Sequence, residues 1–209
     1  MLLYYITDRK LFPGREVQRR EQLLAKVAEI AAAGVDYIQL REKDLSSREL
    51  EQLSRSVIDA VRKNGSKTRL LINSRTDVAL AIGADGVHLR SGDVSPADVR
   101  RIWRSAGSTT DPAVAVSCHS ESEVMAAKAA GADFVVFGPV FGKADTTGTG
   151  IAAFRAACGH GIPVFGLGGV TADNAPSCIE AGAAGIAGIR LFQQELWPVS
   201  IAAFKNREP

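Results

Sequence analysis

Short apolar segments alternate with longer amphipathic segments along the whole chain. The apolar segments are rich in β-branched and aromatic residues, as buried strands are, and they lie near residues 2–7, 35–42, 69–73, 86–90, 113–119, 134–140, 163–169 and 184–190. Between them, apolar residues recur at helical spacing, for example Leu23, Val27 and Ile30. Eight strands that alternate with helices predict an α/β protein, a single (β/α)8 TIM barrel formed by residues 1–209.

A glycine turn repeats at Gly34, Gly83, Gly131 and Gly182, and each copy ends an Ala-rich helical stretch just before a predicted strand. The copies lie 49, 48 and 51 residues apart, which is about the length of two helix-strand pairs. Four copies therefore account for eight strands. Helix-capping signals follow several strands, and they lie at Ser46, Ser95, Ser120 and Thr171.

Composition limits the kind of protein and its partners. A chain of 209 residues, 46% of them hydrophobic, suits one domain near the lower size limit of such a barrel. The net charge of +2 comes from interspersed charges without a basic run, so we expect small anionic ligands and neither nucleic acid nor membrane as a partner. Three widely spaced cysteines and the lack of a signal-peptide pattern predict a reduced, cytoplasmic protein.

Side-chain alternation along the predicted strands separates the barrel interior from the helix layer. In the fifth strand, Ser117 and His119 face inward while Cys118 faces the helices. Barrels of this kind carry their chemistry at the carboxyl ends of the strands. Polar residues predicted to reach that rim are Gln39, Arg41, Lys43, Asn73, Arg90, Ser117 and His119.

Phosphate is the ligand that the predicted rim suits best. Gly168 and Gly169 after the seventh strand, together with Gly188 and Ile189 at the end of the eighth, offer backbone N–H groups where barrels commonly bind phosphate. The glycines also fit a second interpretation, close packing of helix on sheet. Arg41 and Lys43 supply charge for a second anionic group, so we expect two phosphorylated ligands or one long one.

Several motifs carry a family resemblance that extends to about Phe192. They are Tyr5-x-Thr7-Asp8, Ile38-Gln39-Leu40-Arg41-Glu42-Lys43-Asp44, Gly86-Val87-His88-Leu89, Val116-Ser117-Cys118-His119-Ser120, Phe137-Gly138-Pro139-Val140-Phe141 and Leu167-Gly168-Gly169-Val170-Thr171. In this order they resemble the thiamine phosphate synthase/TenI family. The resemblance implies a TIM barrel of thiamine biosynthesis. Synthases of this family join an aminopyrimidine pyrophosphate to a thiazole phosphate with magnesium, whereas TenI-type members aromatise a thiazole carboxylate phosphate by moving a proton.

The chain departs from the synthase pattern at the expected magnesium ligands. Synthases carry Asn-Asp after the third strand, and this chain has Asn73-Ser74. Asp93 matches the second acidic ligand, but Arg90 places a positive charge nearby, and both changes weaken a magnesium site. In synthases the loop after the Gly-Pro-Val-Phe motif helps to bind pyrophosphate, and the sequence of that loop differs in this chain. Lys143 and Thr146 are the candidates here for the residues that bind pyrophosphate. These departures favour the TenI-type branch.

For a proton shift on a thiazole, His119 is the candidate shuttle, because imidazole titrates closest to neutral pH. Ser117 is the second candidate catalytic residue. Arg41, Lys43 or Arg90 would hold the substrate carboxylate, and the glycines its phosphate. An alternative interpretation makes Ser117 and His119 a hydrogen-bonded pair that fills the barrel top, and we expect His88 to be structural.

Three functions remain open, all with small phosphorylated thiazole or pyrimidine ligands as partners. The favoured one is a TenI-type thiazole tautomerase, an isomerase for which no cofactor is expected. The second is thiamine phosphate synthase, a transferase with magnesium held through Asp93. The third is a catalytically silent thiazole-phosphate-binding regulatory protein. The last predicted helix, with Leu196, Trp197 and Phe204, fits either the barrel bottom or the interface of a homodimer.

Overall fold

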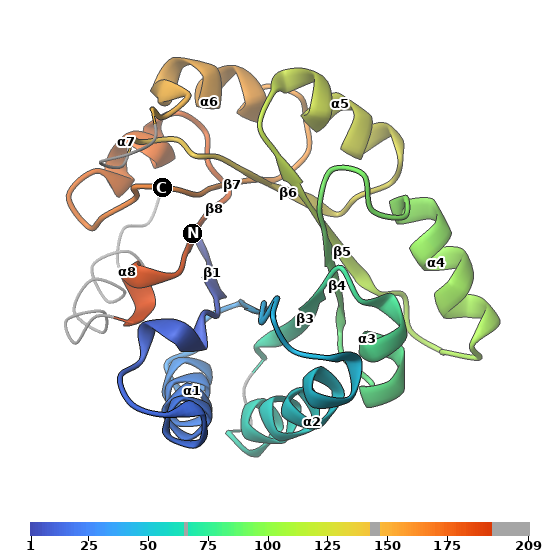
Figure 1. The fold of residues 1–209 in the computed structure, drawn as a ribbon. Helices are drawn as coiled ribbons and strands as arrows, with labels where there is room; N and C mark the ends of the chain where they lie inside the picture. Colours follow the sequence, from blue (N-terminus) through green and yellow to red (C-terminus); the bar gives the residue numbers. More distant parts are fainter. Residues whose placement is uncertain (65–66, 143–146, 194–209) are drawn as a thin grey trace.

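Eight parallel strands form a closed barrel, in chain order from β1 to β8, with helices around it (Figure 1). The computed structural model describes residues 1–64, 67–142 and 147–193. The strands are β1 (Leu2–Ile6), β2 (Tyr37–Leu40), β3 (Arg69–Asn73), β4 (Gly86–Leu89), β5 (Ala113–Cys118), β6 (Phe134–Phe137), β7 (Val164–Gly166) and β8 (Gly185–Gly188). The predicted barrel is confirmed.

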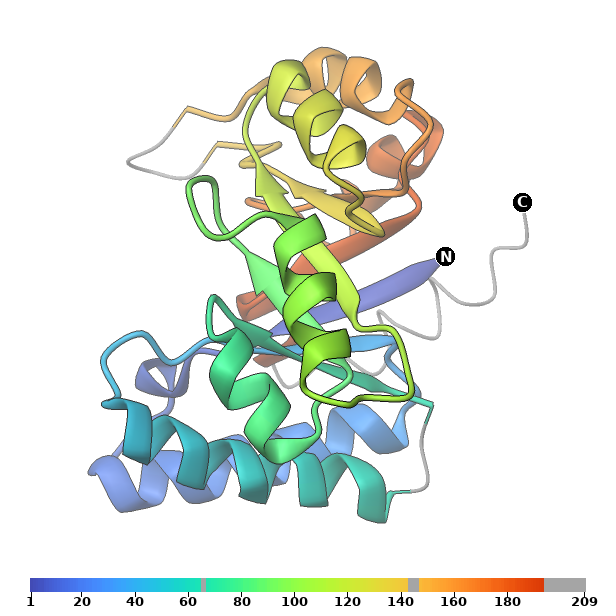
Figure 2. The same ribbon diagram turned by 90° about the vertical axis from the view of Figure 1, so that its right-hand side faces the viewer.

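Helices follow the strands and cover the barrel from outside. They are the 3-10 helix η1 (Arg9–Leu11) and the α-helices α1 (Glu16–Ala32), α2 (Ser47–Lys63), α3 (Thr76–Ile82), α4 (Pro96–Ser105), α5 (Glu121–Ala129), α6 (Gly150–Cys158), α7 (Ala175–Glu180) and α8 (Arg190–Gln193). Figure 2 shows the barrel from the side, with α1, α2 and α3 on one side of the strands, α5 and α6 on the other, and α4 between these two groups. No helix in the described part of the chain is long and apolar enough to cross a membrane.

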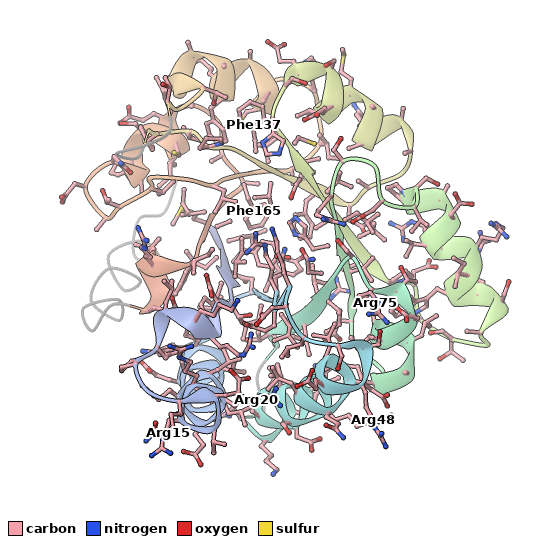
Figure 3. All side chains as sticks on the ribbon, in the orientation of Figure 1. Arg15, Arg20, Arg48, Arg75, Phe137 and Phe165 are labelled. Carbon is pink, nitrogen blue, oxygen red and sulfur yellow. The ribbon has the colours of Figure 1, made fainter. Side chains whose placement is uncertain are left out.

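The inner face of the barrel is filled by aromatic rings. The ring centroids of Phe134 and Phe165 lie 4.9 Å apart, and those of Phe134 and Tyr37 lie 4.8 Å apart. Tyr4 packs edge-on against three of these rings and is fully buried. Figure 3 shows Phe165 within the ring of strands. This packed floor closes the barrel beneath its carboxyl-terminal rim.

The outer faces of the strands pack against the helix layer. Ile38 and Leu40 of β2 belong to this outer core, as do Val114 and Cys118 of β5, whereas Tyr37 packs with the inner cluster. The alternation predicted for β2 and β5 is therefore confirmed. Helix α2 begins where its sequence predicts, because the Ser46 side chain accepts from the Glu49 backbone N–H and the Glu49 carboxylate returns a hydrogen bond to Ser46.

The seventh helix begins later than predicted. Thr171 does not cap it, because Thr171 and Asn174 bond each other. The Thr171 N–H donates to Asn174 Oδ1 at 2.8 Å, and the Asn174 N–H donates to Thr171 Oγ1 at 3.4 Å. This reciprocal pair holds residues 171–174 in a turn, and α7 starts only at Ala175. The predicted last helix lies outside the described residues.

Glycine is required inside β4 by the neighbouring strand. A Cβ on Gly86 would lie 1.9 Å from the Ala113 carbonyl oxygen, whereas a Cβ on Gly83 would meet nothing within 4 Å. We predict that Gly86→Ala lowers the free energy of unfolding by about 3 kcal/mol or more, because backbone atoms must move. Gly83→Ala should cost only about 1 kcal/mol, the strain of its left-handed conformation. Urea denaturation of both variants checks this, and equal losses would contradict the packing argument.

Candidate functional site

A cavity of about 850 Å³ opens at the carboxyl-terminal rim, and the end of every strand contributes to its lining. Ile6 and Asn73, which line it, are the last residues of β1 and β3, and Gly138 lies just after β6. The sequence placed its candidate residues at this rim, and the structure brings them together. The predicted residues that line the cavity are Gln39, Arg41, Lys43, Asn73, Arg90, Ser117, His119, Gly168, Gly169, Gly188 and Ile189.

One predicted residue is absent from the cavity lining, and two others cannot be placed because they lie outside the described residues. Lys143 and Thr146 lie outside the described residues, and Asp93 lies behind Arg90 rather than in the lining. Sequence reasoning left other lining residues out of the site, among them Leu11, Pro139, Arg190 and Asp8. Asp8 caps η1 through a hydrogen bond from the Lys10 N–H. Asp8 and Pro139 each lie just after a predicted strand, and this position could have indicated that they reach the rim.

Three cations converge on one side of the cavity. Repulsion by Arg41 lowers the pKa of Lys43, burial adds to the effect, and Arg90 contributes further repulsion. Within the described ranges, no carboxylate forms an ion pair with Arg41 or Lys43. Other arginines, such as Arg15 and Arg48, lie at the periphery of the helix layer (Figure 3). A bound anion would relieve the repulsion at the rim, so this side of the cavity suits phosphate or carboxylate.

A buried ion pair holds the loop that carries Arg41 and Lys43. The Arg41 N–H donates to Thr7 Oγ1 at 3.0 Å, and the Thr7 hydroxyl donates to Glu42 Oε1 at 2.7 Å. Arg9 Nη1 donates to Glu42 Oε2 at 2.9 Å, and both side chains are almost completely buried. Burial raises the pKa of Glu42, although the hydrogen bonds from Thr7 and Arg9 oppose the rise. The loop is thereby tied to the end of β1.

The ends of β3 and β4 meet in a second polar cluster. Asp93 accepts from Ser74 Oγ at 2.6 Å and from the Arg90 N–H at 2.8 Å, and its other oxygen pairs with Arg90 Nη2 at 3.2 Å. Arg90 Nε also donates to Ser74 Oγ at 3.0 Å. Burial opposes ionisation of Asp93, yet the hydrogen bonds from Ser74 and Arg90 lower its pKa overall. Both carboxylate oxygens are therefore engaged by protein donors.

His119 stands at the cavity edge with one ring nitrogen engaged. Its Nδ1 is hydrogen-bonded to the Gly138 carbonyl oxygen. Because a carbonyl only accepts, Nδ1 carries a proton, so the lone pair of the neutral ring lies on Nε2, which has no hydrogen-bond partner among the described residues. The Ser117 hydroxyl is hydrogen-bonded to His88 Nε2 at 2.8 Å and not to His119. The predicted alternative, a hydrogen-bonded pair of Ser117 and His119, is therefore wrong. His88, which we expect to be structural, forms two hydrogen bonds, to Ser117 and to Tyr4, and it also lines the cavity.

Gly168 and Gly169 form the opposite side of the cavity. A Cβ on Gly168 would lie 2.6 Å from Pro139 Cα, and a Cβ on Gly169 would lie 2.7 Å from the Phe141 carbonyl oxygen. Close packing therefore requires both glycines, but they pack against the segment after β6 and not, as the second interpretation of the sequence held, against a helix. Their backbone N–H groups nevertheless donate to no acceptor in the described part of the chain, which leaves them available to a phosphate.

Comparison with known proteins identifies the family. The sequence pattern described as thiamine monophosphate synthase matches residues 3–192. The chain belongs to the thiamine monophosphate synthase (TMP-TENI) family. It is 43% identical over 190 residues to a Geobacter sulfurreducens protein named provisionally as a thiamine-phosphate synthase, covering 88% of this chain and 83% of that protein. It is 37% identical over 190 residues to the thiamine-phosphate synthase of Azorhizobium caulinodans, covering 88% and 84%.

Solved structures agree with the family assignment. The thiamine phosphate pyrophosphorylase from Pyrococcus furiosus superposes with a TM-score of 0.79 at 28% identity, covering 98% of this chain and 93% of that one. 3-Hexulose-6-phosphate synthase, at a TM-score of 0.64 and 20% identity, shares the fold alone. The relatives' names favour the synthase alternative over the TenI-type branch that the sequence departures favoured.

Magnesium, which the family's synthases use, does not fit the residues at this position. Asp93 is the candidate ligand, but its oxygens are held by Ser74 and Arg90. The described residues contain no group of three His, Cys, Asp or Glu side chains that could hold a metal. Magnesium prefers several oxygen ligands in a tight octahedron, and it would meet the Arg90 guanidinium here.

The buried ion pair beneath the cation loop gives a stability prediction. Arg9→Met leaves the buried Glu42 carboxylate without its cation, so we expect a loss of about 3–5 kcal/mol in the free energy of unfolding. Arg55→Met, which removes an exposed partner of Glu51, should cost less than about 1 kcal/mol. Urea denaturation measures both. A second replacement, Glu42→Leu, should recover much of the loss in the Arg9→Met background, and failure to recover any would contradict the argument from an unpaired charge.

Proposed function

We propose that this member of the family binds a phosphorylated thiazole and moves a proton on its ring, as a TenI-type tautomerase does. One observation carries the proposal. Arg90 bonds both Asp93 and Ser74, so a guanidinium lies against the one acidic residue that resembles a synthase's metal ligand. A proton shift requires no metal, and the remaining groups of the cavity suit it.

Each side of the cavity would bind a different anionic group of such a substrate. The free N–H groups of Gly168 and Gly169 would hold the phosphate. Arg41 and Lys43, which lack a carboxylate partner among the described residues, would hold the carboxylate on the opposite side. This division fixes the orientation of the thiazole ring between the two anion sites.

His119 would carry the proton between two positions of the ring. Its Nε2 lone pair accepts the proton that leaves the ring, and the imidazolium then returns that proton to the second position, so the enzyme ends unchanged. The Gly138 carbonyl keeps the other nitrogen protonated throughout and stabilises the imidazolium. The His119 backbone N–H donates to Glu123, which further fixes the residue at the end of β5.

Thiamine-phosphate synthase is the second candidate, and the names of the relatives favour it. This transferase would use the same cavity for two phosphorylated substrates. The cations of the rim would have to hold the pyrophosphate group of the aminopyrimidine substrate. The family comparison thus supports the transferase, while the local chemistry around Asp93 supports the isomerase.

Replacing His119 tests the proposed chemistry. We predict that His119→Gln lowers kcat for aromatisation of the thiazole carboxylate phosphate about a thousandfold, because the proton acceptor is lost. The Kd for thiazole phosphate should change less than about threefold, since the anion sites are intact. His160→Gln is the matched control, because His160 pairs with Glu121 and does not line the cavity. Single-turnover assays and calorimetry measure the two quantities.

The same preparation separates the alternatives. Incubation with aminopyrimidine pyrophosphate, thiazole phosphate and magnesium should give no thiamine phosphate above background. Rapid magnesium-dependent coupling would instead establish the transferase. Thiazole phosphate binding without turnover in either assay would overturn both enzymatic proposals in favour of a silent binding protein.

A further inference from the structure

Four side chains form a continuous hydrogen-bonded chain beneath the cavity. Gln39 Nε2 donates to the Tyr4 hydroxyl at 3.2 Å, the Tyr4 hydroxyl bonds His88 Nδ1 at 2.9 Å, and His88 Nε2 bonds Ser117 Oγ at 2.8 Å. Tyr4 is fully buried, and Gln39 and His88 are at most 2% exposed. Gln39, His88 and Ser117 line the cavity. This polar relay connects β2, β1, β4 and β5 through the centre of the barrel.

The relay contains a neutral imidazole. Burial lowers the pKa of His88 to about 3, and repulsion from Arg41 adds to the effect while Asp93 opposes it. A neutral imidazole has one N–H donor and one acceptor nitrogen. Because both nitrogens of His88 are hydrogen-bonded, one of its two partners must donate to it and the other must accept from it.

The amide at the start of the relay fixes which partner donates. The Gln39 Nε2 amide only donates, so the Tyr4 oxygen accepts that bond. The buried Tyr4 hydroxyl has no acceptor for its own proton among the described residues except His88 Nδ1, so it donates there. The remaining His88 proton is then on Nε2, and it is donated to Ser117 Oγ. Ser117 Oγ therefore accepts a hydrogen bond from His88, and its own hydroxyl proton is free to be donated to a group in the cavity.

We propose that this relay makes Ser117 an obligatory hydrogen-bond donor to the bound ligand. The ligand must present an acceptor there, such as an aromatic ring nitrogen or a carboxylate oxygen, and a ligand that presents an N–H group at the same point is rejected. Tyr4, His88 and Gln39 act as positioning residues for Ser117. The identity of the probe ligand rests on the proposed function, but the direction of the relay does not.

The His88 tautomer is the direct readout in the free protein. The chain has three histidines, so a His119→Gln/His160→Gln variant leaves His88 as the only imidazole. Long-range proton-nitrogen correlation spectra of this variant, labelled with nitrogen-15, should show a neutral ring with the proton on Nε2. A proton on Nδ1, or on both nitrogens, at neutral pH would overturn the proposal.

Reversing the relay tests its effect on the ligand. In Gln39→Glu the introduced carboxylate, on the same face as Arg41, accepts only, so Tyr4 donates to it and accepts from His88 Nδ1. Ser117 must then donate to His88 Nε2. We expect the His88 proton to move to Nδ1 and the Kd for thiazole phosphate to rise about tenfold, the value of one hydrogen bond.

A double-variant cycle separates the relay from direct contact by Gln39. Ser117→Ala should raise the same Kd about tenfold, and Gln39→Glu should add no further loss in the Ser117→Ala background. Additive losses would show that Gln39 acts independently of Ser117 and would overturn the relay. If thiazole phosphate does not bind the unmodified protein at all, the proposed function fails, while the His88 tautomer still tests the relay on its own.

Discussion

Closure of the sheet between β8 and β1 is the constraint on which the site depends. Leu2 to Tyr5 pair in register with Gly185 to Gly188, which joins the last strand to the first. Gly185 permits this approach, because a Cβ there would lie 2.4 Å from the Leu2 carbonyl oxygen and 2.5 Å from the Phe165 ring. Once the barrel is closed, the carboxyl ends of all eight strands surround one cavity, and residues far apart in sequence share it.

Two buried polar systems hold the groups that face this cavity. The Arg9–Glu42 pair anchors the loop with Arg41, and the relay that ends at Ser117 runs through the aromatic floor. Each polar atom in these systems that is buried has a partner, which offsets the cost of placing it there. Above them, Arg41 and Lys43 form no ion pair with any described carboxylate, so the charge of these two side chains is left for an anionic ligand to balance.

The sequence could predict the barrel and most of the cavity lining, because strand periodicity dictates which face a side chain takes. Gln39, Arg41 and Ser117 were found in this way. It could not predict partners that tertiary packing decides. Ser117 bonds His88 from the neighbouring strand, whereas His119 lies beyond the end of β5 at Cys118 and meets Gly138.

The most direct test of the account is calorimetric titration of the protein with thiazole phosphate and with pyrophosphate, each with and without magnesium. If the guanidinium of Arg90 stands where a metal would otherwise be needed, thiazole phosphate binds through its phosphate and magnesium changes neither Kd by more than about threefold. Tight pyrophosphate binding that appears only with magnesium would contradict the account, because it would require Asp93 to leave Arg90 and Ser74 for the metal.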